Sequence, residues 1–343
     1  MYEWVDGVKA GSRRNVRLLL QIFIMVAIIG GLLWYVGIDS FLGVLARVRL
    51  EYLVFSVFCY FMINILFAVR LMRVLGREGV RTSFGRTLLG QYAGMLTSDV
   101  TPGKSGYVLT PVYLRDQGIS TSTSLSCVLG IQSVEFLVKV LGGVMAVVFL
   151  VGAASLSLQD LVVASLGIGL MLTGSVLLAL MVWSDRMIGL FHRVASSKFL
   201  GKITGGLIGK VEEYREGAKK TRGAVPEIAL VTVGCWVLKG FEWFFLGLAL
   251  GITQIGWLGF FLLHPLVTAL GFVPLTPSGI GFQEGAITGI FLLLGVPLSV
   301  GSAFAILARV MLIVQDLVGI PQIAKSTSVL VISQGTTSKP SSE

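Results

Sequence analysis

The stretch "TSDVTPGKSGYVLT" (residues 97–110) decides the fold, because it places an acid, a lysine, a proline and two glycines inside an otherwise apolar chain. A related segment, "LTPSGIGFQEGA" (residues 275–286), lies in the second half of the chain. Proline lacks a backbone N–H and glycine favours non-helical backbone, so both residues interrupt helices. Each segment therefore predicts a break between two apolar helices.

The composition identifies the class of protein. Of 343 residues, 55% are hydrophobic and 13% are charged, and the mean hydropathy is +0.87. A soluble domain carries about 25% charged residues, so we expect an integral membrane protein. The net charge of +9 comes from basic residues that flank apolar runs, which is typical of cytoplasmic loops and not of a nucleic-acid-binding surface.

Apolar runs predict an all-α, polytopic helical bundle. A helix needs about 20 apolar residues to cross the hydrocarbon core of a membrane. The first such run is too long for a signal peptide and lacks a cleavage site, so we expect an uncleaved anchor. Six stretches qualify as spans: 18–36, 52–69, 121–140, 161–184, 228–250 and 299–319.

Basic residues predict the orientation of these spans, since cytoplasmic loops carry the excess of lysine and arginine. Arginines precede the first span, and nine basic residues follow the fourth. We therefore expect both termini to be cytoplasmic in a cell-membrane protein; Arg47 and Arg49 oppose this scheme but are outnumbered. The end of the second span is placed on the cytoplasmic side by Arg70, Arg73, Arg77, Arg81 and Arg86.

This orientation makes the first polar segment the tip of a re-entrant hairpin. Residues 84–115 must begin and end on the cytoplasmic side. The first arm, residues 84–98, would be a helix of about 22 Å, which is too short to cross. Irregular backbone at that depth is tolerated only where it is buried in protein or lines a wet cavity.

The second half repeats this order in the opposite orientation. Span 228–250 precedes a broken pair, 257–275 and 282–294, and span 299–319 follows. Segment 257–275 is long enough to span by itself, so a true hairpin and a crossing helix both stay open here. Inverted repeats with broken helices indicate a transporter whose site lies near the membrane midplane.

The domain organisation follows from the repeats. We expect one transmembrane domain over residues 1–325, in which a basic cytoplasmic loop, 185–227, joins repeat one (15–184) to repeat two (228–320). The polar tail, 326–343, is expected to be disordered.

Two longer stretches resemble the signatures of a known membrane family. They are "TPGKSGYVLTPVYLRDQGIS" (101–120) and "LTPSGIGFQEGAITGIFLLLGVPLSVGSAFAILAR" (275–309). They are similar to the flippase-like membrane region of lysylphosphatidylglycerol synthases, which also occurs in stand-alone UPF0104-type membrane proteins. The first stretch departs from the family pattern at Tyr107 and Val108, where a glycine and a glutamate tend to stand. The resemblance implies a stand-alone lipid translocator or lipid binder, and not a synthase.

Ionisable residues inside predicted spans are candidate binding residues, because each costs about 2.5–3.5 kcal/mol on membrane-insertion scales. Glu135 and Lys139 lie four residues apart, and Lys239 and Glu242 lie three apart, so each pair shares a helix face. Two interpretations stay open for each pair: mutual neutralisation that stabilises the bundle, or the lining of a cavity.

Arg309 differs from these pairs because no carboxylate lies within one helical turn of it. A distant partner or a substrate must therefore meet its charge. Glu284, three residues after Gly281, is the expected partner.

The two polar segments are candidate anion sites. A half-helix that begins after each break would direct its positive dipole end into the membrane, where it binds phosphate without a charged side chain. The alternative is that proline and glycine only kink the helices for packing. The remaining candidate substrate-binding residues are Thr101, Pro102, Lys104, Ser105, Gly106, Arg115, Thr276, Pro277, Ser278, Gly279 and Gly281.

The sequence therefore predicts a translocator of a phosphate-containing or anionic lipid, with isoprenoid-linked lipids among the candidates, that works without ATP hydrolysis. No catalytic, cofactor-binding or metal-binding motif is present, so we expect neither an enzyme nor a bound cofactor. Two alternatives stay open: a secondary transporter of a small anion, or a non-transporting lipid-binding partner of a separate enzyme. Membrane lipids are the expected partners, and nucleic acid is not.

Overall fold

The computed structural model describes residues 30, 34, 37–101, 104–153, 158–184, 186, 207–271, 276 and 278–326, and over these residues it is all-helical. Five helices are long and apolar enough to cross a membrane, which confirms five of the predicted spans. The predicted span 18–36 and tail 326–343 lie almost wholly outside the described residues. The five helices are α3 (Leu50–Arg77), α6 (Thr121–Ala153), α7 (Leu158–Trp183), α11 (Val225–Ala249) and α14 (Leu298–Asp316).

Local signals set the ends of the long helices. Ser120 accepts the backbone N–H of Ser122 on its hydroxyl at 3.2 Å, and this N-cap begins α6. At the end of α11, Gly251 adopts a φ of 76°, which glycine adopts without strain. The N–H of Ile252 then bonds the carbonyl of Gly247 at 2.8 Å, a bond that closes the last turn.

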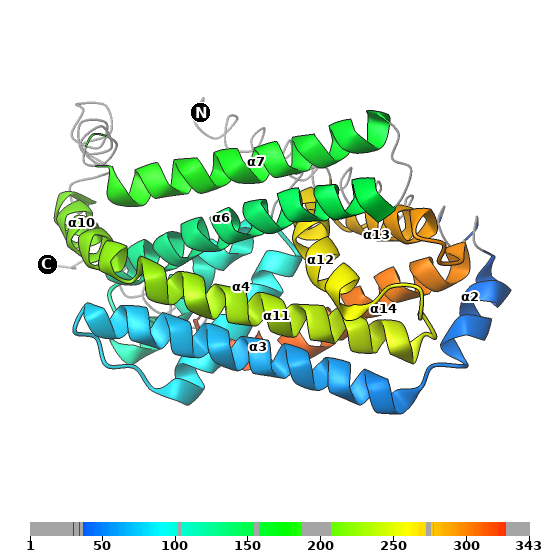
Figure 1. Cartoon of the computed structure of the whole chain (residues 1–343). Coiled ribbons are helices and arrows are strands. Elements are labelled where there is room, and N and C mark those ends of the chain that lie inside the picture. The colour runs from blue at the N-terminus through cyan, green and yellow to red at the C-terminus, as the bar shows by residue number, and fades with distance from the viewer. Residues whose placement is uncertain are drawn as a thin grey trace, which may run out of the picture.

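The two repeats run in opposite directions. Helices α3 and α11 lie side by side and antiparallel (Figure 1). The N–H of Arg49, before α3, bonds the carbonyl of Ala249 at the end of α11 at 2.9 Å. At the other end, Arg77 bonds the carbonyl of Gly223 and the carboxylate of Glu227. Helices α6 and α14 also run in opposite directions (Figure 1).

Both predicted hairpins are broken helices. The first consists of α4 (Phe84–Asp99), the short 3₁₀ helix η1 (Ser105–Leu109) and α5 (Thr110–Tyr113). The second consists of α12 (Trp257–Gly271) and α13 (Phe282–Leu293). At 1.5 Å per residue, α12 is about 22 Å long, so it is too short to cross as a helix.

The prediction of a half-helix after the first break is wrong. Residues 105–109 form a 3₁₀ helix and α5 has four residues, so no helix dipole of useful length begins there. Gly106 explains the tighter backbone: a Cβ at this position would overlap the carbonyl group of Thr97 on α4. The returning arm therefore packs directly on α4.

The two breaks meet inside the bundle. We name residues 100–105 tip one and residues 276–281 tip two. The N–H of Ser278 in tip two donates to the carbonyl oxygen of Thr101 in tip one at 2.9 Å. Each tip also holds a non-glycine residue at positive φ, Lys104 at 54° and Ser278 at 50°; over the described residues there are no others. Backbone in this region is costly and is found mainly where surrounding structure enforces it.

Aromatic packing holds the second hairpin. Phe260 of α12, Phe291 of α13 and Phe304 of α14 are fully buried. Their ring centroids lie 4.8 Å apart for Phe291 and Phe304, and 5.7 Å apart for Phe260 and Phe304. Because lipid is as apolar as these side chains, close packing rather than water exclusion is what favours the cluster.

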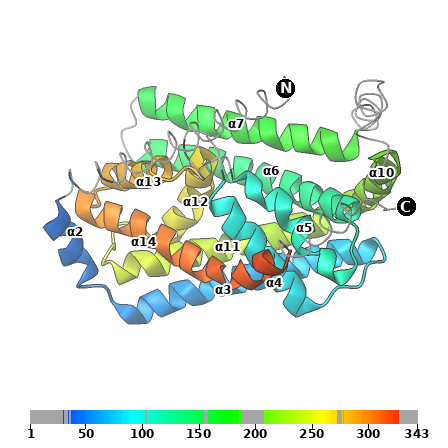
Figure 2. The ribbon, with the colours of Figure 1, turned by 180° about the vertical axis from the view of Figure 1, so that it is seen from behind.

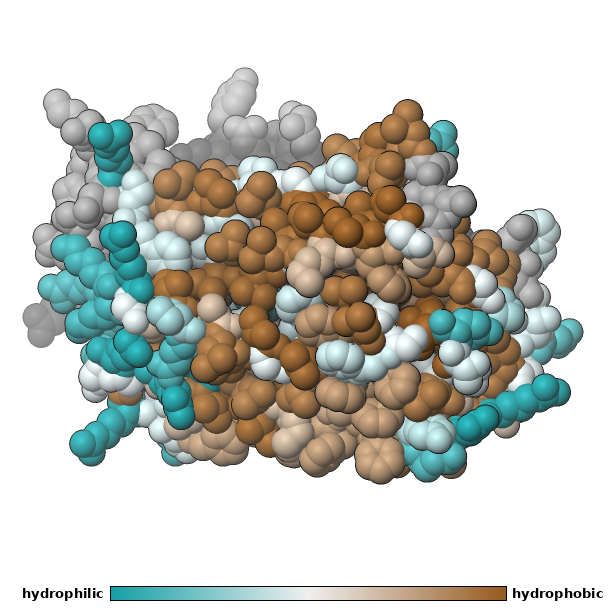
Figure 3. Space-filling model, viewed as in Figure 1, coloured by the Kyte–Doolittle hydropathy of each residue, from teal (hydrophilic) through white to brown (hydrophobic). Residues whose placement is uncertain are grey.

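Hydrophilic residues gather at both ends of the molecule, most of all at the end near α10, and a broad apolar band lies between them (Figure 3). Within the predicted loop 185–227, the structure describes a helix, α10 (Leu207–Gly223), which packs on α6. Lys220 of α10 pairs with Glu78 at 3.4 Å. At the same end, burial acts to raise the pKa of Asp116, but hydrogen bonds from Lys325 and Gln322 hold this pKa below its ordinary value.

Replacing Gly319 with alanine is expected to destabilise the protein by about 1–3 kcal/mol through overpacking. Gly319 lies in η3 (Leu317–Gly319), after α14, and a Cβ there would overlap the backbone of Tyr92 and Ala93 on α4. The measurement is the unfolding midpoint in mixed detergent micelles. Gly234→Ala, on an open face of α11, is the matched control and should leave the midpoint unchanged or raise it. Equal midpoints for the two variants would contradict this packing.

Candidate functional site

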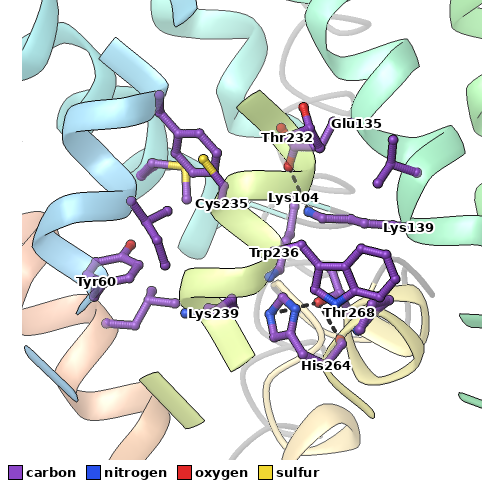
Figure 4. Close-up of a pocket in the computed structure, with 16 residues that line it drawn as sticks. Tyr60, Lys104, Glu135, Lys139, Thr232, Cys235, Trp236, Lys239, His264 and Thr268 are labelled. Atoms are coloured by element: carbon purple, nitrogen blue, oxygen red, sulfur yellow. Dashed lines mark hydrogen bonds and ion pairs between the residues drawn. The ribbon is translucent and has the colours of Figure 1, made fainter. Parts of the chain in front are cut away.

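A cavity of about 100 Å³, lined by apolar and charged side chains, lies between α3, α6, α11, α12 and tip one. Figure 4 shows Lys104, Lys139 and Lys239 converging on it with Trp236 and His264. Lys104 comes from tip one, Lys139 from α6 and Lys239 from α11. Lys139 and Lys239 lie far from the ends of their helices. The cavity is therefore lined by three lysines and one carboxylate, that of Glu135.

A second cavity of about 60 Å³ adjoins the first and continues toward α13 and α14. The two cavities share five lining residues: Lys104, Lys239, His264, Thr268 and Leu312. The second adds Glu242, Gln283, Glu284 and Arg309. We name the two together the tip cavity.

Glu135 holds two cations, one more than the sequence predicts. Its carboxylate accepts from Lys139 at 2.7 Å, as expected, and from Arg70 at 2.8 Å. Arg70 is 4% exposed and also donates to Thr232 at 2.7 Å. Its placement in a cytoplasmic flank is wrong, because α3 continues to Arg77 and carries Arg70 into the interior.

The predicted partner of Arg309 is confirmed as a contact. Its Nε donates to Glu284 Oε1 at 2.6 Å, and its guanidinium also donates to Gln283 Oε1. The local pair predicted on α11 forms as well, with Lys239 Nζ 2.7 Å from both carboxylate oxygens of Glu242. The two interpretations of these ion pairs, mutual neutralisation and the lining of a cavity, therefore both hold: each pair neutralises its own charges and also lines the tip cavity.

Lys104 differs from the other cations of the cavity. Over the described residues its ammonium group has no carboxylate within salt-bridge distance, although it lines both parts of the tip cavity. A cation in the interior without a bound carboxylate is costly unless water or an anion meets it. The side chain that follows the first break is therefore the group best placed to meet an anionic ligand.

Tip two does not present a bare helix N-terminus. The carboxylate of Glu284 turns back and accepts the N–H of Gly281, so the chain itself occupies part of the anion site predicted at the start of α13. The hydroxyls of Thr276 and Ser278 are fully buried and have no hydrogen-bond partner among the described residues. Gly279 and Gly281 supply positive φ, at 69° and 86°.

The remaining predicted residues divide into two groups. In tip one, the Thr101 hydroxyl accepts the N–H of Gly106 at 2.7 Å, and Ser105 begins η1, so these residues shape the tip. Arg115 lies apart from the tip cavity: it is exposed in η2 (Arg115–Gln117) and donates to Thr121 at 2.7 Å. Pro102 and Pro277 lie outside the described residues.

The residues predicted for the site do not include Tyr60, Asp99 or Asp316. Tyr60, on α3, lines the tip cavity and donates its hydroxyl to both carboxylate oxygens of Asp316 at 2.9 Å. Asp99, the last residue of α4, is also buried. The available signal was the presence of acids within or beside apolar runs, but their partners lie far away in sequence.

Comparisons with known proteins agree with this arrangement. The family model described as "Lysylphosphatidylglycerol synthase TM region" matches residues 22–319. The chain is also similar to the UPF0104 membrane protein PH1989 of Pyrococcus horikoshii, with 24% identity over 312 residues, which cover 84% of this chain and 91% of that protein. With the apolar spans and broken helices described above, these matches show that the chain is a multi-pass membrane protein that belongs to the lysylphosphatidylglycerol synthase TM region family.

Proposed function

We propose that this protein translocates the headgroup of a phosphate-containing or anionic lipid across the membrane, without ATP hydrolysis. The observation that carries the proposal is the tip cavity, where Lys104 faces an internal space without a carboxylate partner among the described residues. An anion that enters the cavity would neutralise this charge and recover part of its desolvation cost.

The other cations favour a ligand with several oxygens. Lys139, Lys239 and Arg309 each hold a carboxylate at 2.6–2.7 Å, so a phosphate group can compete for the same donors. The headgroup would exchange between these cations as it passes the tips, while the hydrocarbon chains stay in lipid. The name of the matched family contains a phospholipid, which supports a lipid as the substrate class.

Replacing Lys104 with methionine is expected to slow translocation at least tenfold, since it removes the cavity lysine that pairs with no carboxylate among the described residues. The measurement is the movement of acyl-labelled fluorescent phosphatidylglycerol in proteoliposomes, followed by an impermeant quencher. Lys219→Met, at an exposed position on α10, is the matched control and should keep the wild-type rate.

Two results would contradict the proposal. One is equal rates for Lys104→Met and the wild type. The other is uptake of a small anion such as inorganic phosphate with no movement of the labelled lipid, which would favour the anion-transporter alternative.

A further inference from the structure

Two carboxyl groups meet in the interior, beside the tip cavity. Asp99 ends α4 directly before tip one, and Asp316 ends α14; they are 2% and 0% exposed. Their side chains lie within hydrogen-bonding reach of each other. Helices α4 and α14 cross at this point, as the rear view shows (Figure 2).

Around this pair, hydrogen-bond acceptors outnumber hydrogen-bond donors. The Tyr60 hydroxyl supplies one hydrogen to Asp316. Among the described residues, neither Asp99 Oδ2 nor Asn64 Oδ1, one turn after Tyr60 on α3, has a hydrogen-bond donor, and both atoms are buried. The Asn64 side chain lies against the Tyr60 hydroxyl, and its amide nitrogen bonds the Tyr60 carbonyl at 3.1 Å. A buried acceptor without a donor calls for a missing hydrogen or ion.

No cation of the described residues neutralises the pair directly. The charged groups that face it are Lys104 from tip one, Lys239 from α11 and Arg309 from α14. Lys239 is bonded to Glu242 and Arg309 to Glu284, and neither aspartate forms a salt bridge in the described part of the chain. Tyr60 and Tyr92 are the neighbouring phenols. Two carboxylates in contact cannot both stay ionised without such a partner.

We propose that Asp99 and Asp316 form a proton-binding site, in which one proton is held between the two carboxyl groups. A shared proton supplies the missing donor, because a protonated carboxyl donates one hydrogen bond to its neighbour. A sodium ion is the competing occupant, since hard cations bind oxygen ligands, and the experiment below distinguishes it from a proton.

The position of the site gives the proton a role in opening the tip cavity. This role rests on the proposed function. Asp99 leads directly into tip one, and α14 carries Arg309. The shared proton therefore holds tip one against α14, and its release would set two negative charges against each other and separate them. Proton binding is thus coupled to the opening of the tip cavity.

Infrared spectroscopy of the whole protein in lipid tests the site without any transport assay. At neutral pH the wild type should show the C=O stretch of a protonated carboxyl group, shifted in deuterated water. Asp99→Asn and Asp316→Asn should each remove this band. Glu227→Gln, a paired carboxylate at the polar end, is the matched control and should retain it.

Three outcomes would overturn the inference. The first is a wild-type spectrum with no protonated carboxyl band at neutral pH, which decides the matter even if a variant fails to fold. The second is a band that persists in both asparagine variants. The third is a band that disappears when sodium chloride replaces choline chloride, which indicates a sodium site. Failed lipid translocation with the band present would contradict the proposed function and leave the proton site standing.

Discussion

Replacing Glu135 with leucine is expected to destabilise the protein by about 3–5 kcal/mol, because the change leaves buried cations without their counter-charge. Glu135 is the common acceptor of Arg70 and Lys139, at 2.8 and 2.7 Å. Among the described residues, Arg70 would keep its hydrogen bond to Thr232 and its contact with the Phe67 ring, and a guanidinium cannot lose its proton to escape the cost. The unfolding midpoint in mixed detergent micelles measures the loss.

Two further variants separate this effect from general damage. Glu227→Leu also removes a carboxylate shared by two arginines, Arg73 and Arg77, but at an exposed end of the molecule. Exposed pairs contribute about 0–1 kcal/mol, so this variant should remain close to the wild type. The double variant Arg70→Met/Glu135→Leu should recover part of the stability. Equal losses for Glu135→Leu and Glu227→Leu would show that Arg70 and Lys139 do not depend on Glu135.

Replacing Arg309 with leucine is expected to cost a similar amount, about 3–5 kcal/mol, for the opposite reason. Within the described part of the chain, the change leaves the interior carboxylate of Glu284 with only the N–H of Gly281 as a donor, and it removes the donor to Gln283 Oε1. Thermal unfolding of the purified protein measures the effect.

The arginine geometry at this site can be tested by charge-conserving changes. Arg309→Lys keeps the charge but lacks the planar set of donors that reaches both Glu284 and Gln283, so an intermediate loss is expected. Arg309→Leu/Glu284→Gln removes the buried charge and should be more stable than Arg309→Leu. The idea fails if the double variant is no more stable than the single one.

Much of the fold follows from the sequence, because two strong constraints act on it. Apolar runs must cover the hydrocarbon core, which predicts the helix at 228–250 to within a few residues and the start, but not the end, of the helix at 52–69. The count of basic residues then forces 84–115 to return to the side from which it enters. The same reasoning found the contact between Arg309 and Glu284, since an interior arginine without a local carboxylate needs a distant one.

The details of the site could not be predicted, because they depend on helix length and tertiary contact. Arg70 was assigned to a flank, since charge counting treats any arginine at the end of an apolar run as exposed; the helix continues for two more turns and turns this residue inward. The 3₁₀ form of η1 depends on the close approach of Gly106 to α4. The meeting of Asp99 and Asp316 depends on how two distant helices cross.

The hydrogen bond between the tips joins two main-chain groups, the N–H of Ser278 and the carbonyl of Thr101. Such a bond does not depend on which side chain either residue carries. A change of side chain therefore does not remove this hydrogen bond between the two halves, whereas the charges around it belong to side chains that a substitution can remove. A designer who wishes to change the ligand could alter Lys104 or Arg309 and still keep the joint on which both halves meet.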